Sequence, residues 1–184
     1  MKMPRSISTP SLILRAIELP DAQRMFDNYS QDPEVARYMS WRLTGNLQDT
    51  LSFVTSAVSW WEKPETAADF VYSIFVADSM EFIGTCSAGP HHGTSTYHWG
   101  MGYNLARRFW GQGYGTEAVS ALTNTVMQQA EVFRVSAVVD VENGASARVL
   151  EKSGFQREGI LRRYGMHPNA SAEPRDVFIY SKVK

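Results

Sequence analysis

The chain has 184 residues, of which 43% are hydrophobic, and its formal net charge is −1. A chain of this length can bury a substantial core and is short enough for one domain, so we expect a single domain over residues 1–184. Proteins that bind nucleic acid without regard to sequence carry a net basic face, which this charge balance does not favour. No stretch approaches the roughly 20 apolar residues of a membrane span. We therefore expect a partner that is a small molecule or a protein end, with no nucleic acid and no membrane.

The cysteine content and the amino-terminal segment indicate where the protein works. Cys86 is the single cysteine, so no internal disulfide can form, and such a chain suits a reducing compartment. Pro4 and Pro10 interrupt the basic amino-terminal segment, and no apolar run of signal length follows them. We expect a cytoplasmic protein in which residues 1–11 form a flexible arm.

The first third of the chain predicts one strand and three helices. Residues 12–17 (LILRAI) alternate in the manner of a strand. Residues 19–31 and 32–39 have the pattern of short helices, the second with Asp32 as its N-cap. Residues 46–63 place apolar side chains at helical spacing, which predicts a helix with one buried face formed by Leu47, Leu51, Val54, Val58 and Trp61.

From residue 70 the apolar pattern changes to that of strands. Residues 70–77 and 81–89 are rich in β-forming side chains and are separated by a short turn, which predicts a hairpin. Residues 97–105 (YHWGMGYNL) predict a third strand, with aromatic and Met side chains on one face and His98, Gly100, Gly102 and Asn104 on the other. Glycines inside a strand often mark a place where a ligand or another chain lies close.

Two adjacent histidines, His91 and His92, precede this third strand and raise the question of a metal site. Adjacent side chains point apart on an extended chain, and no third ligand stands at a useful spacing. We therefore expect a solvated loop here and no metal.

The last third predicts alternating helices and strands. A helix is expected at 116–131, a strand at 132–140, a helix at 143–155 that a glycine closes, and a terminal strand pair at 159–166 and 176–183. Taken with the preceding elements, this order predicts an α+β fold in which helices cover a mixed sheet.

A cluster of glycines, RRFWGQGYG at residues 107–115, stands directly before the helix at 116–131. The first turn of a helix presents unpaired N–H groups and the positive end of the helix dipole, and glycines remove the β-carbons that would hold a phosphate away. Gly111, Gly113 and Gly115 therefore suit a pyrophosphate at the helix start, with Arg107 and Arg108 adding positive charge. A flexible turn is the alternative.

Two familiar phosphate-binding motifs do not match this cluster. A P-loop requires a lysine after its last glycine, whereas Thr116 and Glu117 follow Gly115. A dinucleotide-binding fold requires G-x-G-x-x-G directly after its strand, whereas here the spacing is G-x-G-x-G and residues 106–110 intervene. Asp140, at the end of a predicted strand, is placed like the ribose-binding acid of that fold, so a nucleotide-dependent oxidoreductase remains an alternative.

Two long segments together resemble a known family. GYNLARRFWGQGYGTEAV (102–119) and VVDVENGASARVLEKSGFQREGILR (138–162) are similar to the GNAT acetyltransferase superfamily, in particular the RimJ/RimL type that acetylates the N-termini of ribosomal proteins, and the resemblance covers residues 12–182. It implies a GNAT fold, with a mostly antiparallel twisted sheet of about seven strands that is splayed at the cofactor site. It also implies an N-acetyltransferase, monomeric or homodimeric, that takes acetyl-CoA as cosubstrate and acetylates a primary amine by direct attack in a ternary complex.

The resemblance also implies which residues contact the cofactor. The family motif, Arg/Gln-x-x-Gly-x-Gly/Ala, holds the pyrophosphate by its backbone, and Trp110 stands here where the basic residue would be, which shifts charge recognition to Arg107 or Arg108. Asn143 would bind CoA and can equally be a helix N-cap. Pantetheine would lie along the strand end, where an N–H near Leu105 could serve as oxyanion donor. The expected contacts are Asn104, Leu105, Arg107, Arg108, Trp110, Gly111, Gln112, Gly113, Tyr114, Gly115, Thr116, Asn143 and Ser146.

The catalytic groups depart from the family pattern at several positions. Leu150 stands where many members have a tyrosine acid, while Ser146 matches the RimL-type serine that hydrogen-bonds the sulfur, with helix capping as its alternative role. Gly165 stands where the RimL pattern has a glutamate, so His98 is the nearest titratable substitute for the base. Alternatively, His98 lies at the outer end of its strand against the loop before it. A free α-amine has a pKa of about 8, so a water chain could replace a strong base.

Three hypotheses follow for the function. The first is an acetyl-CoA-dependent N-acetyltransferase acting on protein N-termini or a small amine. The second is a catalytically silent acetyl-CoA sensor with the same fold, and the third is the nucleotide-dependent oxidoreductase.

Overall fold

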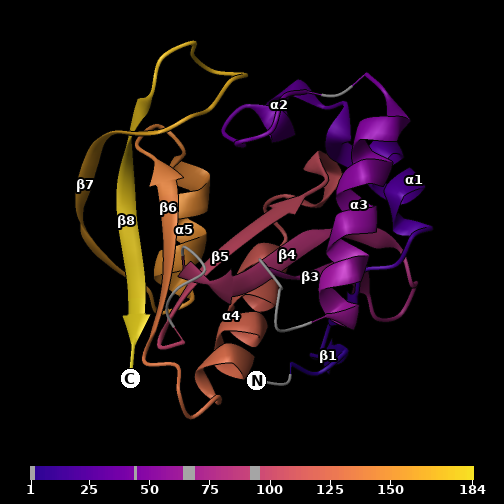
Figure 1. The fold of residues 1–184 in the computed structure, drawn as a ribbon, viewed down its shortest axis with the longest axis horizontal. Coiled ribbons are helices and arrows are strands. Elements are labelled where there is room, and N and C mark those ends of the chain that lie inside the picture. Colours follow the sequence, from indigo (N-terminus) through magenta and orange to yellow (C-terminus); the bar gives the residue numbers. More distant parts are fainter. Residues whose placement is uncertain (1–2, 44, 64–68, 92–95) are drawn as a thin grey trace.

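The computed structural model describes residues 3–43, 45–63, 69–91 and 96–184 (Figure 1). Its strands form one eight-stranded sheet in the order β1-β2-β3-β4-β5-β6-β8-β7, in which only the β5–β6 pair is parallel. The strands are β1 (Ser6–Ser8), β2 (Leu12–Ala16), β3 (Phe70–Val76), β4 (Phe82–Pro90), β5 (His98–Leu105), β6 (Arg134–Asp140), β7 (Gln156–Gly165) and β8 (Arg175–Val183). The expected mixed, mostly antiparallel sheet is confirmed, with one strand more than expected.

The additional strand corrects the prediction of a flexible arm at residues 1–11. Ser6–Ser8 pair antiparallel with β2, and the Tyr72 hydroxyl donates a hydrogen bond to the Pro4 carbonyl oxygen at 2.6 Å. Met3 is buried in the core. Residues 3–8 are therefore bound to the sheet, because β2 offers a free edge that backbone hydrogen bonds can extend.

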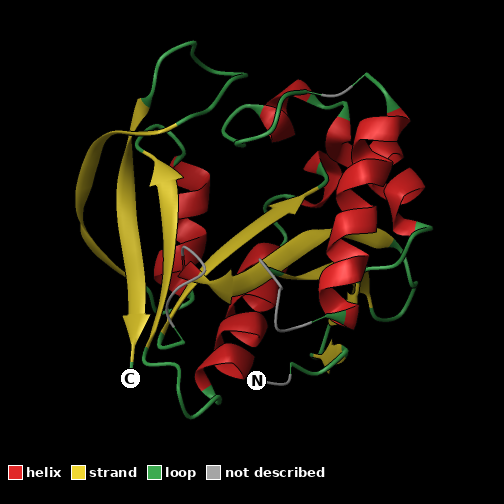
Figure 2. Ribbon diagram, in the orientation of Figure 1, coloured by secondary structure: helices red, strands yellow, loops and turns green. Residues whose placement is uncertain are grey.

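The helices lie on both faces of the sheet (Figure 2). They are α1 (Asp21–Met25), a π-helical turn η1 (Phe26–Ser30), α2 (Pro33–Ala36), α3 (Leu47–Glu62), a 3₁₀ turn η4 (Arg107–Phe109), α4 (Tyr114–Met127) and α5 (Gly144–Lys152). The Asp32 N-cap is confirmed by a 2.9 Å hydrogen bond from the Glu34 N–H to its carboxylate. Helix α4 is shorter than the expected 116–131 at its end, since residues 128–131 turn back toward β6. Among the helices of the described ranges, none is long and apolar enough to cross a membrane.

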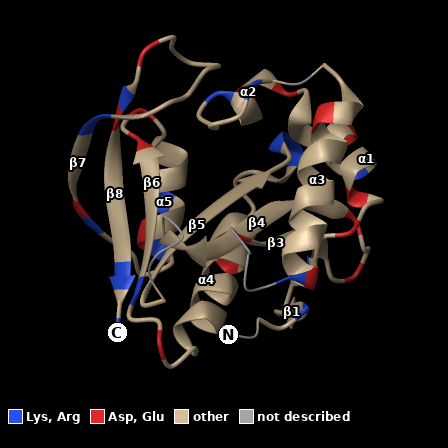
Figure 3. Cartoon of the chain, in the orientation of Figure 1, with Lys and Arg blue, Asp and Glu red and all other residues tan. Residues whose placement is uncertain are grey.

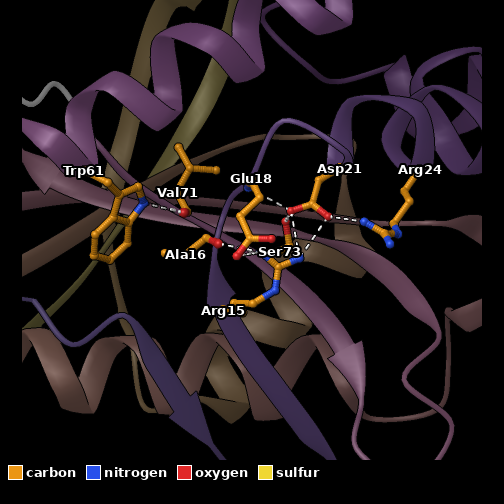
Figure 4. Close-up of polar contacts among 8 residues, drawn as sticks. All are labelled: Arg15, Ala16, Glu18, Asp21, Arg24, Trp61, Val71 and Ser73. Atoms are coloured by element: carbon orange, nitrogen blue, oxygen red, sulfur yellow. Dashed lines mark hydrogen bonds and ion pairs between the residues drawn. The ribbon is translucent and has the colours of Figure 1, made fainter.

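One face of the sheet carries α1, η1 and α3, which a buried carboxylate fixes in place (Figure 4). Asp21 is 0% exposed and accepts hydrogen bonds from Ser73 Oγ at 2.7 Å, from the Arg24 guanidinium at 2.8 Å and from the Arg15 guanidinium at 3.0 and 3.1 Å. On the same face the Trp61 indole N–H of α3 donates to the Val71 carbonyl oxygen at 2.8 Å. A buried charge needs such partners, and these tie α1 and α3 to β3.

Helix α4 covers the opposite face. Its buried side chains, Ala118, Val119, Leu122, Thr123 and Val126, pack against the middle of the sheet. The Thr123 hydroxyl contacts Met101 Sδ at 3.4 Å, which places Met101 on the α4 face of β5. Alternation along the strand therefore turns Gly100, Gly102 and Asn104 toward the face that carries α1 and α3.

Strands β5 and β6 separate after a short paired stretch, as Figure 1 shows. They pair only at His98–Arg134, Trp99–Val135 and Gly100–Ser136. Beyond Gly100, β5 keeps its pairing with β4 up to Leu105 but has lost β6. The expected splay is confirmed, and it leaves one edge of β5 open over residues 101–105.

Candidate active site

Two cavities adjoin the open end of β5. The first, which we call the glycine cleft, has a volume of about 510 Å³ and lies between the end of α2, the turn at 109–116 and the start of α5. The second, the strand cavity, has a volume of about 430 Å³ and lies over β3, β4 and β5 on the α3 face. Met39, Tyr103 and Asn104 line both cavities. Tyr103 and Asn104 are consecutive in β5 and point to opposite faces, so the two cavities meet across this strand end.

The glycine turn has backbone dihedral angles that residues other than glycine adopt only at a cost in free energy. Gly111 and Gly113 have φ values of 75° and 88°, and a β-carbon at either position would meet no other atom within 4 Å. Their conformation requires glycine, and the space beside them is open. Gly113 is the N-cap of α4 and makes no side-chain cap hydrogen bond. Gly113, Gly115 and Thr116 line the cleft, so the first turn of α4, whose N–H groups have no side-chain cap, borders it.

The structure brings most of the expected cofactor residues to this cleft. The lining includes Asn104, Leu105, Trp110, Gly111, Gly113, Gly115, Thr116, Asn143 and Ser146, and does not include Arg107, Arg108, Gln112 and Tyr114. Arg108 forms an ion pair with Glu81 at 2.9 Å, and Gln112 Nε2 donates to the Arg108 carbonyl oxygen at 2.8 Å. The Trp110 indole N–H donates to the Leu105 carbonyl oxygen at 2.8 Å, which ties the turn to the end of β5.

Positive charge in the cleft comes from residues that the sequence did not single out. Arg37, Arg148 and Lys152 line it, the first beside α2 and the other two on α5. Figure 3 shows how the Lys and Arg positions are distributed along the chain. Arg148 and Lys152 are four residues apart, so they lie on one face of α5. The sequence contained a signal for this, because both basic residues follow Asn143 on the predicted helix at a spacing that puts them on the same face. Glu34 and Glu142 also line the cleft, and Glu142 is paired with Arg175 at 2.8 Å.

At the cleft end nearest β5, Tyr103 and Ser146 form a hydroxyl pair. Ser146 Oγ lies 2.8 Å from the Tyr103 hydroxyl oxygen, across the gap between β5 and α5. The Asn143 side chain accepts the Ser146 N–H at 3.2 Å, so Asn143 caps α5 and the Ser146 hydroxyl is directed to Tyr103. Burial raises the pKa of Tyr103 to about 12, although the hydrogen bond between Tyr103 and Ser146 opposes this. The phenol therefore keeps its proton at neutral pH.

The strand cavity contains a carboxylate, Asp69, that the sequence analysis missed. Asp69 directly precedes β3, and its Oδ2 accepts a hydrogen bond from Ser87 Oγ at 3.4 Å. Burial raises the pKa of Asp69 to about 6, against the lowering effect of Ser87. A carboxylate that titrates near neutral pH beside a cavity is a candidate proton acceptor. The only sequence signal was an acidic residue immediately before a strand of mostly apolar side chains.

His98 lies at the end of β5 that is far from Asn104, next to His91. Its Nε2 is 2.7 Å from Ser136 Oγ of β6, and its ring centroid lies 4.3 Å from that of His91 in the loop before β5, with the two rings tilted by 31°. His98 lines neither cavity and stands six residues before Asn104, about 20 Å along a strand. The structure thus places His98 at the outer end of β5 against the preceding loop, which was the alternative interpretation.

Two other expectations concern metals and nucleotides. Within the described ranges, no group of three or more His, Cys, Asp or Glu side chains could hold a metal ion, and His92 lies outside those ranges. Asp140, the candidate ribose-binding acid, is buried and accepts hydrogen bonds from the Arg175 guanidinium at 2.6 and 3.1 Å. This carboxylate is held inside the structure by Arg175 and lines neither cavity.

Comparison with known proteins gives one consistent family. Residues 11–156 match the model of the acetyltransferase (GNAT) domain. YoaA of Bacillus subtilis (strain 168), an uncharacterized N-acetyltransferase, is 31% identical over 97% of this chain and 96% of its own. The ribosomal protein uS5-alanine N-acetyltransferase of Escherichia coli (strain K12) is 23% identical over 86% of this chain and 81% of its own.

A solved structure extends the likeness to the whole fold. The ribosomal L7/L12 alpha-N-protein acetyltransferase RimL, in complex with coenzyme A, matches with a TM-score of 0.83 and 20% identity over 97% of both chains. The family model matches most of the chain, and YoaA is similar over nearly its full length. The protein is therefore an acyltransferase of the GNAT acetyltransferase family, whose members use acetyl-CoA.

Proposed function

We propose that the protein transfers the acetyl group of acetyl-CoA to a primary amine, either a protein N-terminal α-amine or a small-molecule amine, by direct attack in a ternary complex. The observation that carries this proposal is the meeting of the two cavities at Tyr103 and Asn104, where β5 has separated from β6. One cavity has the backbone and charge of a phosphate site, and the other has a carboxylate suited to an amine. Two substrates can thus meet at one strand end without a covalent enzyme intermediate.

The glycine cleft would hold the CoA portion. The N–H groups around Gly113 and the start of α4 would bind the pyrophosphate, and the side chains of Arg148 and Lys152 would add positive charge. This assignment revises the expected role of Arg108, whose guanidinium is paired with Glu81. The open edge of β5 from Met101 to Leu105 would offer backbone groups to the extended pantetheine and an N–H to the thioester oxygen.

The hydroxyl pair would supply the proton that the thiol needs. As the C–S bond breaks, Ser146 would donate its proton to the sulfur, and Tyr103 would restore it through the 2.8 Å contact. The high pKa of Tyr103 keeps this proton available at neutral pH. The relatives named for acetylating ribosomal proteins support a protein N-terminus as one acceptor class.

The test is thiol release from acetyl-CoA in the presence of an amine panel that spans ribosomal-protein N-terminal peptides, polyamines, aminoglycosides and amino acids. We expect amine-dependent release and a mass increase of one acetyl group on at least one acceptor. Tight acetyl-CoA binding without release on any amine would instead identify a silent sensor.

A further inference from the structure

The strand cavity is lined by one carboxylate together with polar and apolar side chains. Asp69 is the only carboxylate among its lining residues, and no Lys or Arg lines it within the described ranges. Among the described lining residues, a negatively charged group entering this cavity would meet the Asp69 carboxylate and the His91 imidazole, and no Lys or Arg.

We propose that Asp69 binds the ammonium group of the acceptor and takes its proton, and that the acceptor is an amine with an apolar neighbouring group and no carboxylate on the adjacent carbon. This inference rests on the proposed function and assigns the acceptor side of it. It predicts that a free amino acid is rejected, because its α-carboxylate would lie beside Asp69. An amidated α-carbon, as in a peptide N-terminus, or a simple alkylamine satisfies the same chemistry.

The position of Asp69 relative to the strand end supports this role. Ser87 of β4 holds the carboxylate and pairs in register with Gly102 of β5. A β-carbon at Gly102 would meet only Ser87 Oγ, at 3.9 Å, so no side chain stands on β5 between Asp69 and the cavity. Asn104 lies two residues further along the same face, about 7 Å away along the strand. An amine held by Asp69 thus lies over the same face of the sheet as Asn104 at the strand end.

The wall of the cavity on the α3 side gives a role to a large apolar side chain that is exposed to solvent. Phe53 of α3 is 43% exposed, yet it lines the cavity together with Met39 and Trp41. These side chains lie opposite the glycine floor and offer apolar surface to the group attached to the amine. Such an arrangement of one charged group and an apolar wall orients an amphipathic amine.

Asp69, Ser146 and Tyr103 together account for every proton that moves in the reaction. The ammonium gives one proton to the Asp69 carboxylate, and the neutral nitrogen forms the N–C bond to the thioester carbonyl. The tetrahedral intermediate then breaks its C–S bond, and the sulfur receives a proton through Ser146 and Tyr103. The second excess proton of the nitrogen returns to this pair through water, and Asp69 releases its proton to solvent after the amide leaves. Burial, which raises the pKa of Asp69 to about 6, makes this carboxylate a usable base.

The first experiment compares amines that share one side chain. Calorimetric binding and thiol release are measured with phenylalaninamide, phenethylamine, phenylalanine and the peptide Phe-Ala-Ala amide. We expect phenylalanine to be at least about 100-fold poorer than its amide in Kd and kcat/KM, because its carboxylate would be repelled electrostatically by the Asp69 carboxylate. A preference for the peptide over phenethylamine identifies protein N-termini as the source, and the reverse identifies small amines.

The second experiment uses variants and pH. Asp69→Asn should abolish the preference for the amide over the acid and remove a limb of kcat/KM that rises with an apparent pKa of about 6. Ser87→Ala should move that limb to higher pH, because Ser87 stabilises the carboxylate. The other titratable side chains of the cavity are Cys86, His91 and Tyr103, and in His91→Asn the limb should persist. Asp78→Asn, an exposed change in the turn at the other end of β3, is the matched control.

The outcomes separate this inference from the proposed function. Equal handling of phenylalanine and its amide, or a limb that survives in Asp69→Asn, overturns the inference even where amines are acetylated. Asp69-dependent binding of the amide without any thiol release supports the ammonium site and overturns the proposed transfer reaction.

Discussion

At the scale of single residues, the contact between Ser146 and Tyr103 gives the sharpest kinetic prediction. Ser146→Ala should lower kcat by about 10 to 100-fold and leave the Kd for acetyl-CoA nearly unchanged, because the hydroxyl matters most as charge gathers on the sulfur. Steady-state kinetics and calorimetry measure the two effects separately. Ser52→Ala on the exposed side of α3 is a matched control. Full activity of Ser146→Ala would leave the hydroxyl with a structural role only.

Asp69 also gives a prediction about stability. Its pKa is raised from 3.8 to about 6, so the folded protein favours the protonated carboxyl, and ionisation costs stability as the pH rises from about 4 to about 6. The cost is fully present above pH 6 and amounts to at most about 3 kcal/mol. Asp69→Asn should therefore raise the free energy of unfolding at pH 8 and change it little near pH 4. Urea unfolding at both pH values measures this, and a variant that is no more stable at pH 8 than the parent would contradict it.

At the scale of elements, the loop between β7 and β8 holds the segment that forms part of both cavities. Asn169 donates hydrogen bonds to the Ala36 and Trp41 carbonyl oxygens, both at 2.8 Å, and accepts one from the Leu43 N–H at 2.8 Å. Three bonds from one side chain fix a stretch that carries Tyr38, Met39 and Trp41 to the sites. The part of the strand-cavity wall formed by Met39 and Trp41 is therefore positioned by a loop about 130 residues away in the chain, since these two bonds span sequence separations of 128 and 133.

Asn169→Ala should consequently raise the KM for the acceptor by about 10-fold, with a smaller effect on kcat, since each lost hydrogen bond costs about 1 kcal/mol and the segment gains freedom. Initial-rate kinetics at saturating acetyl-CoA measure the split. Ser171→Ala, a change in the same loop that removes only a local contact with Glu173, serves as control. An unchanged acceptor KM in Asn169→Ala would show that the wall does not depend on this loop.

At the scale of the whole molecule, the glycine cleft joins α4, α5, β5 and the end of α2, so a ligand bound there should stabilise the fold as a unit. Acetyl-CoA at a hundredfold excess over its Kd should contribute about 2.7 kcal/mol, which raises the Tm by roughly 5 to 10 °C. Gly113→Val should lose this ligand-induced shift, because φ is 88° at this position and a side chain would block the anion site. Gly45→Val, at a glycine with open space and no positive φ, should keep it. A shift that survives in Gly113→Val would place the phosphates elsewhere.

Much of the fold could be predicted because its signals are local. The strands at 70–77 and 81–89, the Asp32 N-cap and the helix that Gly154 closes with φ 84° each depend on neighbouring residues alone, and all are present. The strand at Ser6–Ser8 was missed because three residues carry no periodicity, and it forms only where β2 offers its edge. The start of α4 at the glycine turn was expected, because the glycines that allow the left-handed turn and the residues of the first helical turn are consecutive in the sequence.

The residues of the candidate site likewise fall into those that local sequence patterns predicted and those that depend on tertiary contacts. The glycine turn, Asn143 and Ser146 were identified from contiguous sequence, and the structure brings them to one cleft. Arg108 and His98 were assigned by nearness in sequence, and tertiary contacts take them elsewhere, to Glu81 and to Ser136. Asp69 acquires its raised pKa from burial in the folded protein, and Tyr103 contacts Ser146 on α5, 43 residues later in the chain. The sequence by itself determined the local backbone conformations of the glycine turn and the helix ends, and it determined the family. Which charges face a ligand was decided only by the tertiary structure, because desolvation and pairing depend on distances between segments that the order of residues does not contain.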